Sequence, residues 1–294
     1  MFGRQRFTIY GLICEGNGKE VPLQSINTNV TIGHMISHVE STLTYKNDSP
    51  DAIETVFKFP LDESSAVYKM VAEIDGRIIT AECQEKEQAK KTYDQAIEHG
   101  NTAFLLREDD HSGDIFLCSL GNIPSQKEVK LTISYVSELS PEVDKSVRFA
   151  LPSVLNPRYK SSESESGQGF GFGQPVQPIK TIESGKGGYS FSVNITIQSQ
   201  VRIESIRSMD QLTVNIDEPS RNSAKASFSS EDCKLKEDIF LNILYENCNQ
   251  PVAMIERGSS KQEGLMKSDV LLLNFYPEME EKARKNGEYI FVID

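Results

Sequence analysis

The chain has 294 residues, a formal net charge of −12, 38% hydrophobic residues and no tryptophan. This length predicts about two domains with buried cores. The acidic balance excludes a nucleic-acid-binding chain, because phosphate contacts need a basic face, and it equally excludes a polybasic membrane-surface role. No apolar stretch approaches the roughly 20 residues of a membrane-spanning helix, so we expect no membrane insertion.

The N-terminus and the cysteines predict the compartment. Residues 7–14 are largely apolar but run straight into Glu15 without a small-residue cleavage site, so we interpret them as a first strand rather than a signal peptide. The five cysteines are odd in number and lack CxxC spacing, which is not a disulfide framework. We therefore expect thiols in a reducing compartment, the cytoplasm, with the nucleus as an alternative.

Alternating apolar and polar residues predict strands in the first half of the chain. Apolar side chains occupy every second position over 129–135 and 53–59, which is typical of strands with one buried face. Asp75-Gly76 between two apolar runs predicts a two-residue hairpin turn. Residues 84–99 differ, because their apolar residues recur at helical spacing before Gly100, and they predict one amphipathic helix.

The second half divides into three parts. Residues 139–187 include a Ser-, Glu- and Gly-rich stretch, which predicts a linker. Residues 188–264 contain several short alternating runs, the clearest over 189–197, and predict a second sandwich-like β module. Residues 265–294 contain two continuous apolar runs, 270–273 and 289–293, which are typical of strands buried on both faces in an α/β sheet.

The first 138 residues resemble the VIT domain, the vault protein and inter-α-trypsin module. The residues that carry the resemblance are spread over about 75 positions: Phe59-Pro60-Leu61, Ala66-Val67, Asp75 to Ile79, Ala89, Tyr93, Ala96, Gly100, Ala103, Leu105, Leu106, Gly121 to Pro124, Val129 and Tyr135. In this family a VIT domain and an intervening β region precede a von Willebrand factor A domain. The resemblance implies a mainly β fold with a VIT β-sandwich, a second β module and an incomplete start of an α/β domain. The expected boundaries are 1–138, 139–187, 188–264 and 265–294.

Tyr289 to Asp294 resemble the first strand of a von Willebrand factor A domain and the aspartate that follows it. The resemblance implies that Asp294 opens an Asp-x-Ser-x-Ser loop that holds Mg²⁺ or Mn²⁺ in a full-length relative. The two serines are absent from these 294 residues, and one carboxylate cannot satisfy a hard cation that takes six or more oxygen ligands. We expect no cofactor in this chain. We also expect the uncovered apolar strand 289–293 to favour association.

Three further candidate sites are weaker than their structural alternatives. Cys83 and His99 bound the expected helix, which separates them by roughly 24 Å and prevents a catalytic dyad. His34 and His38 have the spacing of a metal pair on a helix, but their neighbours predict strands, where they lie roughly 13 Å apart. The acidic turn around Asp110 does not match a calcium-binding loop and is expected to be a solvated hairpin tip.

The function expected from these observations is a non-enzymatic, intracellular protein-interaction or scaffold protein with unidentified protein partners. The family resemblance also implies an association with growth suppression. One alternative is a hydrolase that uses the acidic loop near Asp110 together with Cys83, His99 and Asp109. The other is a secreted adhesion-type binder, which glycans at the sequons Asn29 or Asn194 would favour.

Overall fold

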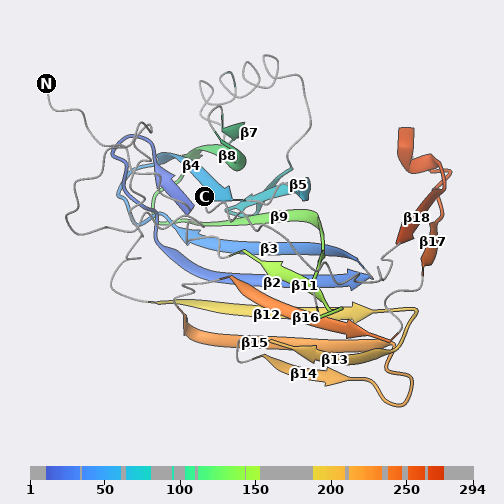
Figure 1. The fold of residues 1–294 in the computed structure, drawn as a ribbon. Coiled ribbons are helices and arrows are strands. Elements are labelled where there is room, and N and C mark those ends of the chain that lie inside the picture. Colours follow the sequence, from blue (N-terminus) through green and yellow to red (C-terminus); the bar gives the residue numbers. More distant parts are fainter. Residues whose placement is uncertain are drawn as a thin grey trace, which may run out of the picture. The chain divides into compact units, whose positions relative to one another are not determined.

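The computed structural model describes residues 11–33, 35–60, 64–80, 95, 103–109, 112–142, 144–152, 188–208, 212–233, 238–246, 251–261 and 264–274. The chain forms two compact units, unit 1 (Met1–Leu244) and unit 2 (Tyr245–Asp294). The described part is almost entirely β-structure (Figure 1).

Unit 1 is organised around an eight-stranded sheet in the order β14-β15-β12-β2-β3-β9-β5-β6. Neighbouring strands are antiparallel, except that β12 runs parallel to β2. The strands are β2 (Leu23–Gly33), β3 (Ile36–Lys46), β5 (Ser65–Ile74), β6 (Arg77–Thr80), β9 (Glu128–Glu138), β12 (Tyr189–Gln198), β14 (Thr213–Ile216) and β15 (Ser223–Cys233).

Three smaller sheets complete the described fold. One has the order β1-β4-β8-β7, with β1 (Gly11–Cys14), β4 (Ile53–Pro60), β7 (Ala103–Asp109) and β8 (Ser112–Ile123). A second has the order β10-β11-β16-β13, with β10 (Ser140–Pro141), β11 (Val147–Leu151), β13 (Ile203–Arg207) and β16 (Ile239–Tyr245). In unit 2, β17 (Val252–Glu256) and β18 (Val270–Asn274) form a two-stranded sheet, and the 3-10 helix η1 (Gly264–Lys267) precedes β18.

The core of unit 1 lies on one face of the eight-stranded sheet. Every second side chain of β2, β3, β9 and β12 is buried, which is the pattern of a sheet covered on one side. Tyr45 of β3 meets Phe57 of β4 edge to face, with 6.1 Å between ring centroids, and Phe57 stacks on Phe59 at 5.3 Å. These rings show that the β1-β4-β8-β7 sheet packs on the buried face.

The strand predictions from alternation are confirmed. Residues 129–135 lie in β9, 53–59 in β4 and 189–197 in β12, each with the expected side buried. Asp75 and Gly76 join β5 to β6 with φ values of 51° and 75°. Two successive positive φ values define the hairpin turn that the Asp-Gly sequence favours.

Two observations differ from the expected organisation. Part of the expected linker, 140–151, forms β10 and β11, because Val147, Phe149 and Leu151 alternate and are buried. The parallel pairing of β12 with β2 also joins strands from both sides of that linker in one sheet. The division into four domains remains a prediction.

The C-terminal part also differs from its expectation. The strand expected over 270–273 is present as β18, but it pairs antiparallel with β17, and most of its side chains are exposed rather than buried in an α/β sheet. Of the expected helix over 84–99 only Gln95 is described, and the expected strand over 289–293 lies wholly outside the described residues.

Candidate interaction surface

Most residues proposed from the sequence as catalytic or metal-binding lie outside the described part of the chain. These are His34, Cys83, His99, Asp110 and Asp294. His38 is described and lies exposed in β3, between Thr31 of β2 and Val136 of β9. A strand at His38 agrees with the prediction that it does not form a helical metal pair with His34.

The acidic segment around Asp110 connects β7 and β8, which pair antiparallel up to Asp109 and Ser112. The expected hairpin is therefore present, although Asp110 and His111 at its tip are outside the described residues. Among the residues that the structure does describe, no three His, Cys, Asp or Glu side chains come together as a possible metal site.

Cys118 offers no activated thiol. Cys118 in β8 is fully buried, and burial raises the pKa of its thiol far above the usual value because the charged thiolate loses its solvation. Cys14, Cys118 and Cys233 form no disulfide bond. A neutral, inaccessible thiol serves packing rather than nucleophilic chemistry.

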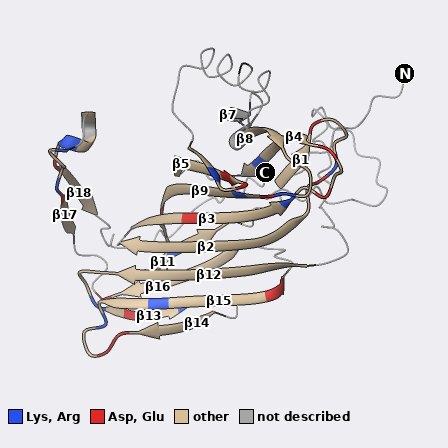
Figure 2. Ribbon diagram, turned by 180° about the vertical axis from the view of Figure 1, so that it is seen from behind, with Lys and Arg blue, Asp and Glu red and all other residues tan. Residues whose placement is uncertain are grey.

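Unit 1 has one broad surface made by the sheet itself, the solvent-facing side of β15, β12, β2, β3 and β9, here called the open face. Its side chains are mostly hydroxyls and amides, and β2 and β12 contain no charged residue at all. Figure 2 shows β2 and β12 free of acidic and basic colouring, whereas β3 and β15 carry charged positions. The strands β2 and β12 of the open face are therefore polar and uncharged, while Glu40, Lys130 and Lys225 add charges on β3, β9 and β15.

Hydrogen bonds between neighbouring strands tie the polar groups of the open face to one another. Thr42 of β3 and Thr132 of β9 share a hydrogen bond of 2.9 Å between their hydroxyl oxygens. The hydroxyl of Ser192 in β12 donates to Oδ1 of Asn27 in β2 at 2.7 Å. Pairing along the surface satisfies these groups without a ligand, so the open face can be stable in contact with water.

The chain has three Asn-x-Ser/Thr sequons, at Asn29, Asn47 and Asn194, and they lie in two environments. Asn29 and Asn194 are exposed and are direct neighbours on β2 and β12 of the open face. Asn47 is buried, and its amide nitrogen donates to the carbonyl oxygens of Asp51, Ile123 and Pro124 at 3.0–3.1 Å. The Asn47 side chain therefore connects two loops and is unavailable to a glycan in the folded protein.

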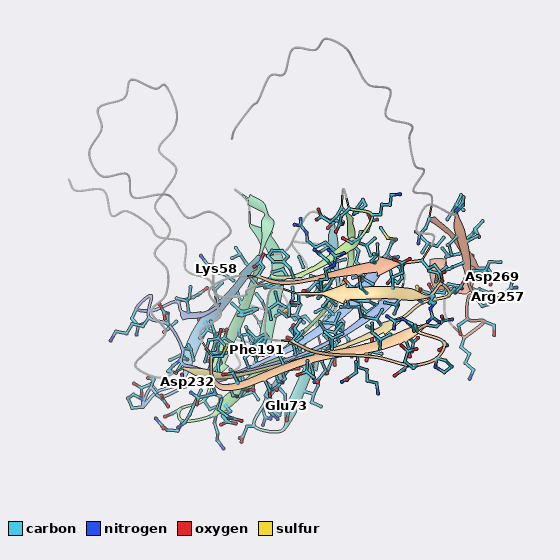
Figure 3. All side chains as sticks on the ribbon, turned by 60° about the horizontal axis from the view of Figure 1, so that its bottom comes forward. Lys58, Glu73, Phe191, Asp232, Arg257 and Asp269 are labelled. Atoms are coloured by element: carbon cyan, nitrogen blue, oxygen red, sulfur yellow. The ribbon has the colours of Figure 1, made fainter. Side chains whose placement is uncertain are left out.

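Unit 2 presents a surface of the opposite character. A long connection joins its two strands, and Gly258 and Lys267 lie close together across this connection. A side chain larger than glycine would not fit at Gly258, because an added Cβ would lie 2.3 Å from the carbonyl oxygen of Lys267. Asp269 accepts the backbone N–H of Gly258 at 2.9 Å and pairs with the guanidinium of Arg257, which lies beside it in Figure 3. These two interactions hold the pKa of Asp269 below its usual value.

The pairing of β17 with β18 gathers apolar side chains on one side. Ala253 is opposite Leu273, and Ile255 is opposite Leu271. Ile255, Leu271 and Leu273 are 58%, 66% and 61% exposed. We call these four side chains the apolar face.

Exposed hydrophobic residues are concentrated in unit 2. Seven large hydrophobic side chains are exposed in the described part of the chain, and five of them belong to this unit: Ile255, Met266, Val270, Leu271 and Leu273. Exposed apolar residues that occur singly are ordinary, whereas contiguous ones mark binding surfaces. The apolar run 270–273 is visible in the sequence but was predicted to be a buried strand, and its partner, the run 252–255, was not predicted.

Comparisons with known proteins agree with this fold. Residues 23–135 match the family model described as the vault protein inter-alpha-trypsin domain, VIT. This match covers β2 to β9, with β12 pairing alongside it from outside.

The relatives extend the similarity over nearly the whole chain. It is 36% identical over 290 residues to von Willebrand factor A domain-containing protein 5A of Rattus norvegicus, covering 97% of this chain and 34% of that protein. The human protein of the same name is 37% identical, with 93% and 35% covered. Protein mono-ADP-ribosyltransferase PARP4 of Mus musculus is 28% identical over 95% of this chain, but only 14% of that protein is covered.

The chain thus spans about a third of the length of the first two relatives. All residues that carried the sequence resemblance lie within the matched range. Residues 23–135 are thus a VIT domain, and von Willebrand factor A domain-containing protein 5A is among the relatives that resemble the chain along nearly its whole length.

Proposed function

We propose that this chain is a non-enzymatic protein-interaction or scaffold module that works in the cytoplasm and holds a protein partner on the apolar face of unit 2. The observation that carries the proposal is the concentration of exposed hydrophobic side chains on β17 and β18. Burying such side chains stabilises a complex by about 25 cal/mol for each Å² removed from water. A surface of this kind favours a partner with an apolar surface of its own.

The chemistry of the two surfaces supports a binding role over a catalytic one. The apolar face contains no ionisable group, and on the open face Thr42 bonds to Thr132 and Ser192 bonds to Asn27. A catalytic site needs convergent polar groups with perturbed ionisation. The hydrolase alternative depends on residues around Asp110 that lie outside the described part, and no described residue favours it.

The thiols support a reducing compartment for this chain. Cys14, Cys118 and Cys233 form no disulfide, as is usual for proteins of the cytoplasm. Among the described residues, no helix has the length and hydropathy needed to cross a bilayer. N-glycans at Asn29 or Asn194 of the native protein would contradict the proposed compartment and favour the secreted alternative.

The interaction is tested by quantitative capture from native cytosol followed by mass spectrometry. Three chains are compared: the wild type, the double variant Leu271→Asp with Leu273→Asp, and the control Met266→Asp, whose side chain is also exposed but lies outside the apolar face. We expect specific proteins to be retained by the wild type and the control and lost with the double variant. Identical sets for all three chains would contradict the proposal.

We propose that Asp294 binds neither Mg²⁺ nor Mn²⁺ tightly within these 294 residues. A single carboxylate supplies too few of the oxygen ligands that Mg²⁺ or Mn²⁺ requires. Titration calorimetry should show no micromolar uptake of either ion. Tight uptake that disappears in Asp294→Ala would overturn this part of the proposal.

A further inference from the structure

The outer edge of β18 has none of the features that protect exposed strand edges. One side of β18 pairs with β17, and no strand in the described part of the chain pairs with the other side. Residues 270–274 contain no charged residue and no proline, and their pairing with β17 is regular, without a bulge. Charges, prolines and bulges are the usual means by which edge strands avoid pairing with another chain.

The apolar face is also too narrow to be stable alone. A two-stranded sheet is marginally stable in water, and independent stability needs three or more strands or a packed cover. Ile255, Leu271 and Leu273 remain more than half exposed with only two strands present. Adding strands at the edge of β18 would widen the sheet and extend the apolar face at the same time.

We propose that β18 pairs antiparallel with β18 of a second copy of this chain, an inference that rests on the proposed role of the apolar face in association. A two-fold axis beside Leu272 aligns all five residues of the two strands. In this register Leu271 lies opposite the partner's Leu273 on the same side of the sheet. The two apolar faces then join into one surface across four strands, which is the self-complementarity that a two-fold interface requires.

The electrostatics of the strand favour a second copy over a charged peptide. An uncharged edge gives no attraction to basic or acidic segments, and it gives no local repulsion between identical strands. Asp269, which precedes the strand, is paired with Arg257, and Glu256 opposite Val270 belongs to β17 rather than to the outer edge. The net charge of −12 on each chain still opposes the approach of two copies over long distances, so dimerisation should strengthen as added salt screens this repulsion.

The test uses the full chain and the variant Leu272→Cys. Directly opposed residues of an antiparallel pair have Cα atoms about 4.5–5.5 Å apart, within the range that a disulfide spans. Under mild oxidation we expect Leu272→Cys to form a disulfide-linked dimer several-fold faster than the wild type. The control Met266→Cys, exposed but outside the strand, should form dimers no faster than the native cysteines allow.

Sedimentation equilibrium gives the independent measurement. The wild type should show a concentration-dependent monomer–dimer equilibrium, and Leu271→Lys should weaken it by about tenfold or more. A rate of proteolysis within residues 252–274 equal to that of the wild type shows that Leu271→Lys keeps unit 2 folded. A monomeric wild type, or equal crosslinking of Leu272→Cys and Met266→Cys, overturns the second copy as the occupant. If protein capture still depends on Leu271 and Leu273 in that case, the proposed function stands and only the partner is different.

Discussion

The eight-stranded sheet of unit 1 and the two-stranded sheet of unit 2 differ in whether their apolar side chains are buried or exposed to water. Each strand of the large sheet alternates, so that its apolar side chains face the core and its hydroxyls and amides face water. In the small sheet the apolar side chains face outward on the described structure, and β18 has one unpaired edge. A sheet that buries its apolar side chains can leave a broad polar face open to water, whereas a sheet that leaves them exposed favours association.

The largest expected difference between the two units is the loss of stability when a large apolar side chain is removed from each of them. Phe57 is fully buried between Tyr45 and Phe59, so Phe57→Ala should lower the free energy of unfolding by about 3–5 kcal/mol. Leu271→Ala should change it by no more than about 0.5 kcal/mol, because that side chain is already exposed. Urea denaturation measures both, and equal losses would show that the apolar face is covered in solution.

A smaller effect is expected from the buried amide of Asn47. Asn47→Ala removes the donor that serves three carbonyl oxygens and should cost about 2 kcal/mol, because buried acceptors are left without a partner. The exposed Asn29 on the open face is the matched control, and Asn29→Ala should change stability by less than about 0.5 kcal/mol. A neutral Asn47→Ala variant would mean that water replaces the amide in these loops.

Each unit also contains an exposed carboxylate whose pKa is lowered from 3.8. The hydroxyl and backbone N–H of Ser146 lower the pKa of Asp144, and Gly258 and Arg257 lower that of Asp269. Each carboxylate therefore adds stability above its usual pKa, and this contribution is lost as the pH falls through its lowered value. In Ser146→Ala the pKa of Asp144, followed by NMR titration, should rise towards 3.8 while that of Asp269 stays unchanged. A matching rise at Asp269 would show that the two sites are coupled.

The smallest expected effect is that of removing residues 265–294 on unit 1. These residues belong to unit 2, and the core of unit 1 is built from its own sheets. Calorimetry should therefore find the main melting transition at the same temperature with and without them. A large loss of cooperativity would show that unit 1 needs the C-terminal residues to fold.

Local pattern predicted the strands well because alternation reports burial directly. The Asp75-Gly76 turn and β9, β12 and β16 could all be read from neighbouring residues. The parallel pairing of β12 with β2 could not, because it joins segments more than 150 positions apart. The alternation of Val147, Phe149 and Leu151 does indicate β11, but these residues were included in the predicted linker next to the low-complexity segment.

The candidate surface was predicted less well than the fold. The apolar run 270–273 was visible, but a run of this kind gives no indication of what covers it. Only its pairing with 252–256 shows that the covering strand is absent from the described part. The acidic loop around Asp110 and the proposed metal ligand Asp294 became candidate sites because carboxylates can bind metals or take part in catalysis. Both residues lie outside the described part of the chain.

Hydroxyl-radical footprinting of the full chain, dilute and concentrated, tests most directly the claim that association belongs to the apolar face. It reports the solvent access of individual side chains in both units of the same molecule. We predict that Ile255, Leu271 and Leu273 become protected as the concentration rises, while His38 on the open face keeps its reactivity. Protection of His38 with unchanged reactivity at Leu271 and Leu273 would contradict the account, because it would place association on the open face.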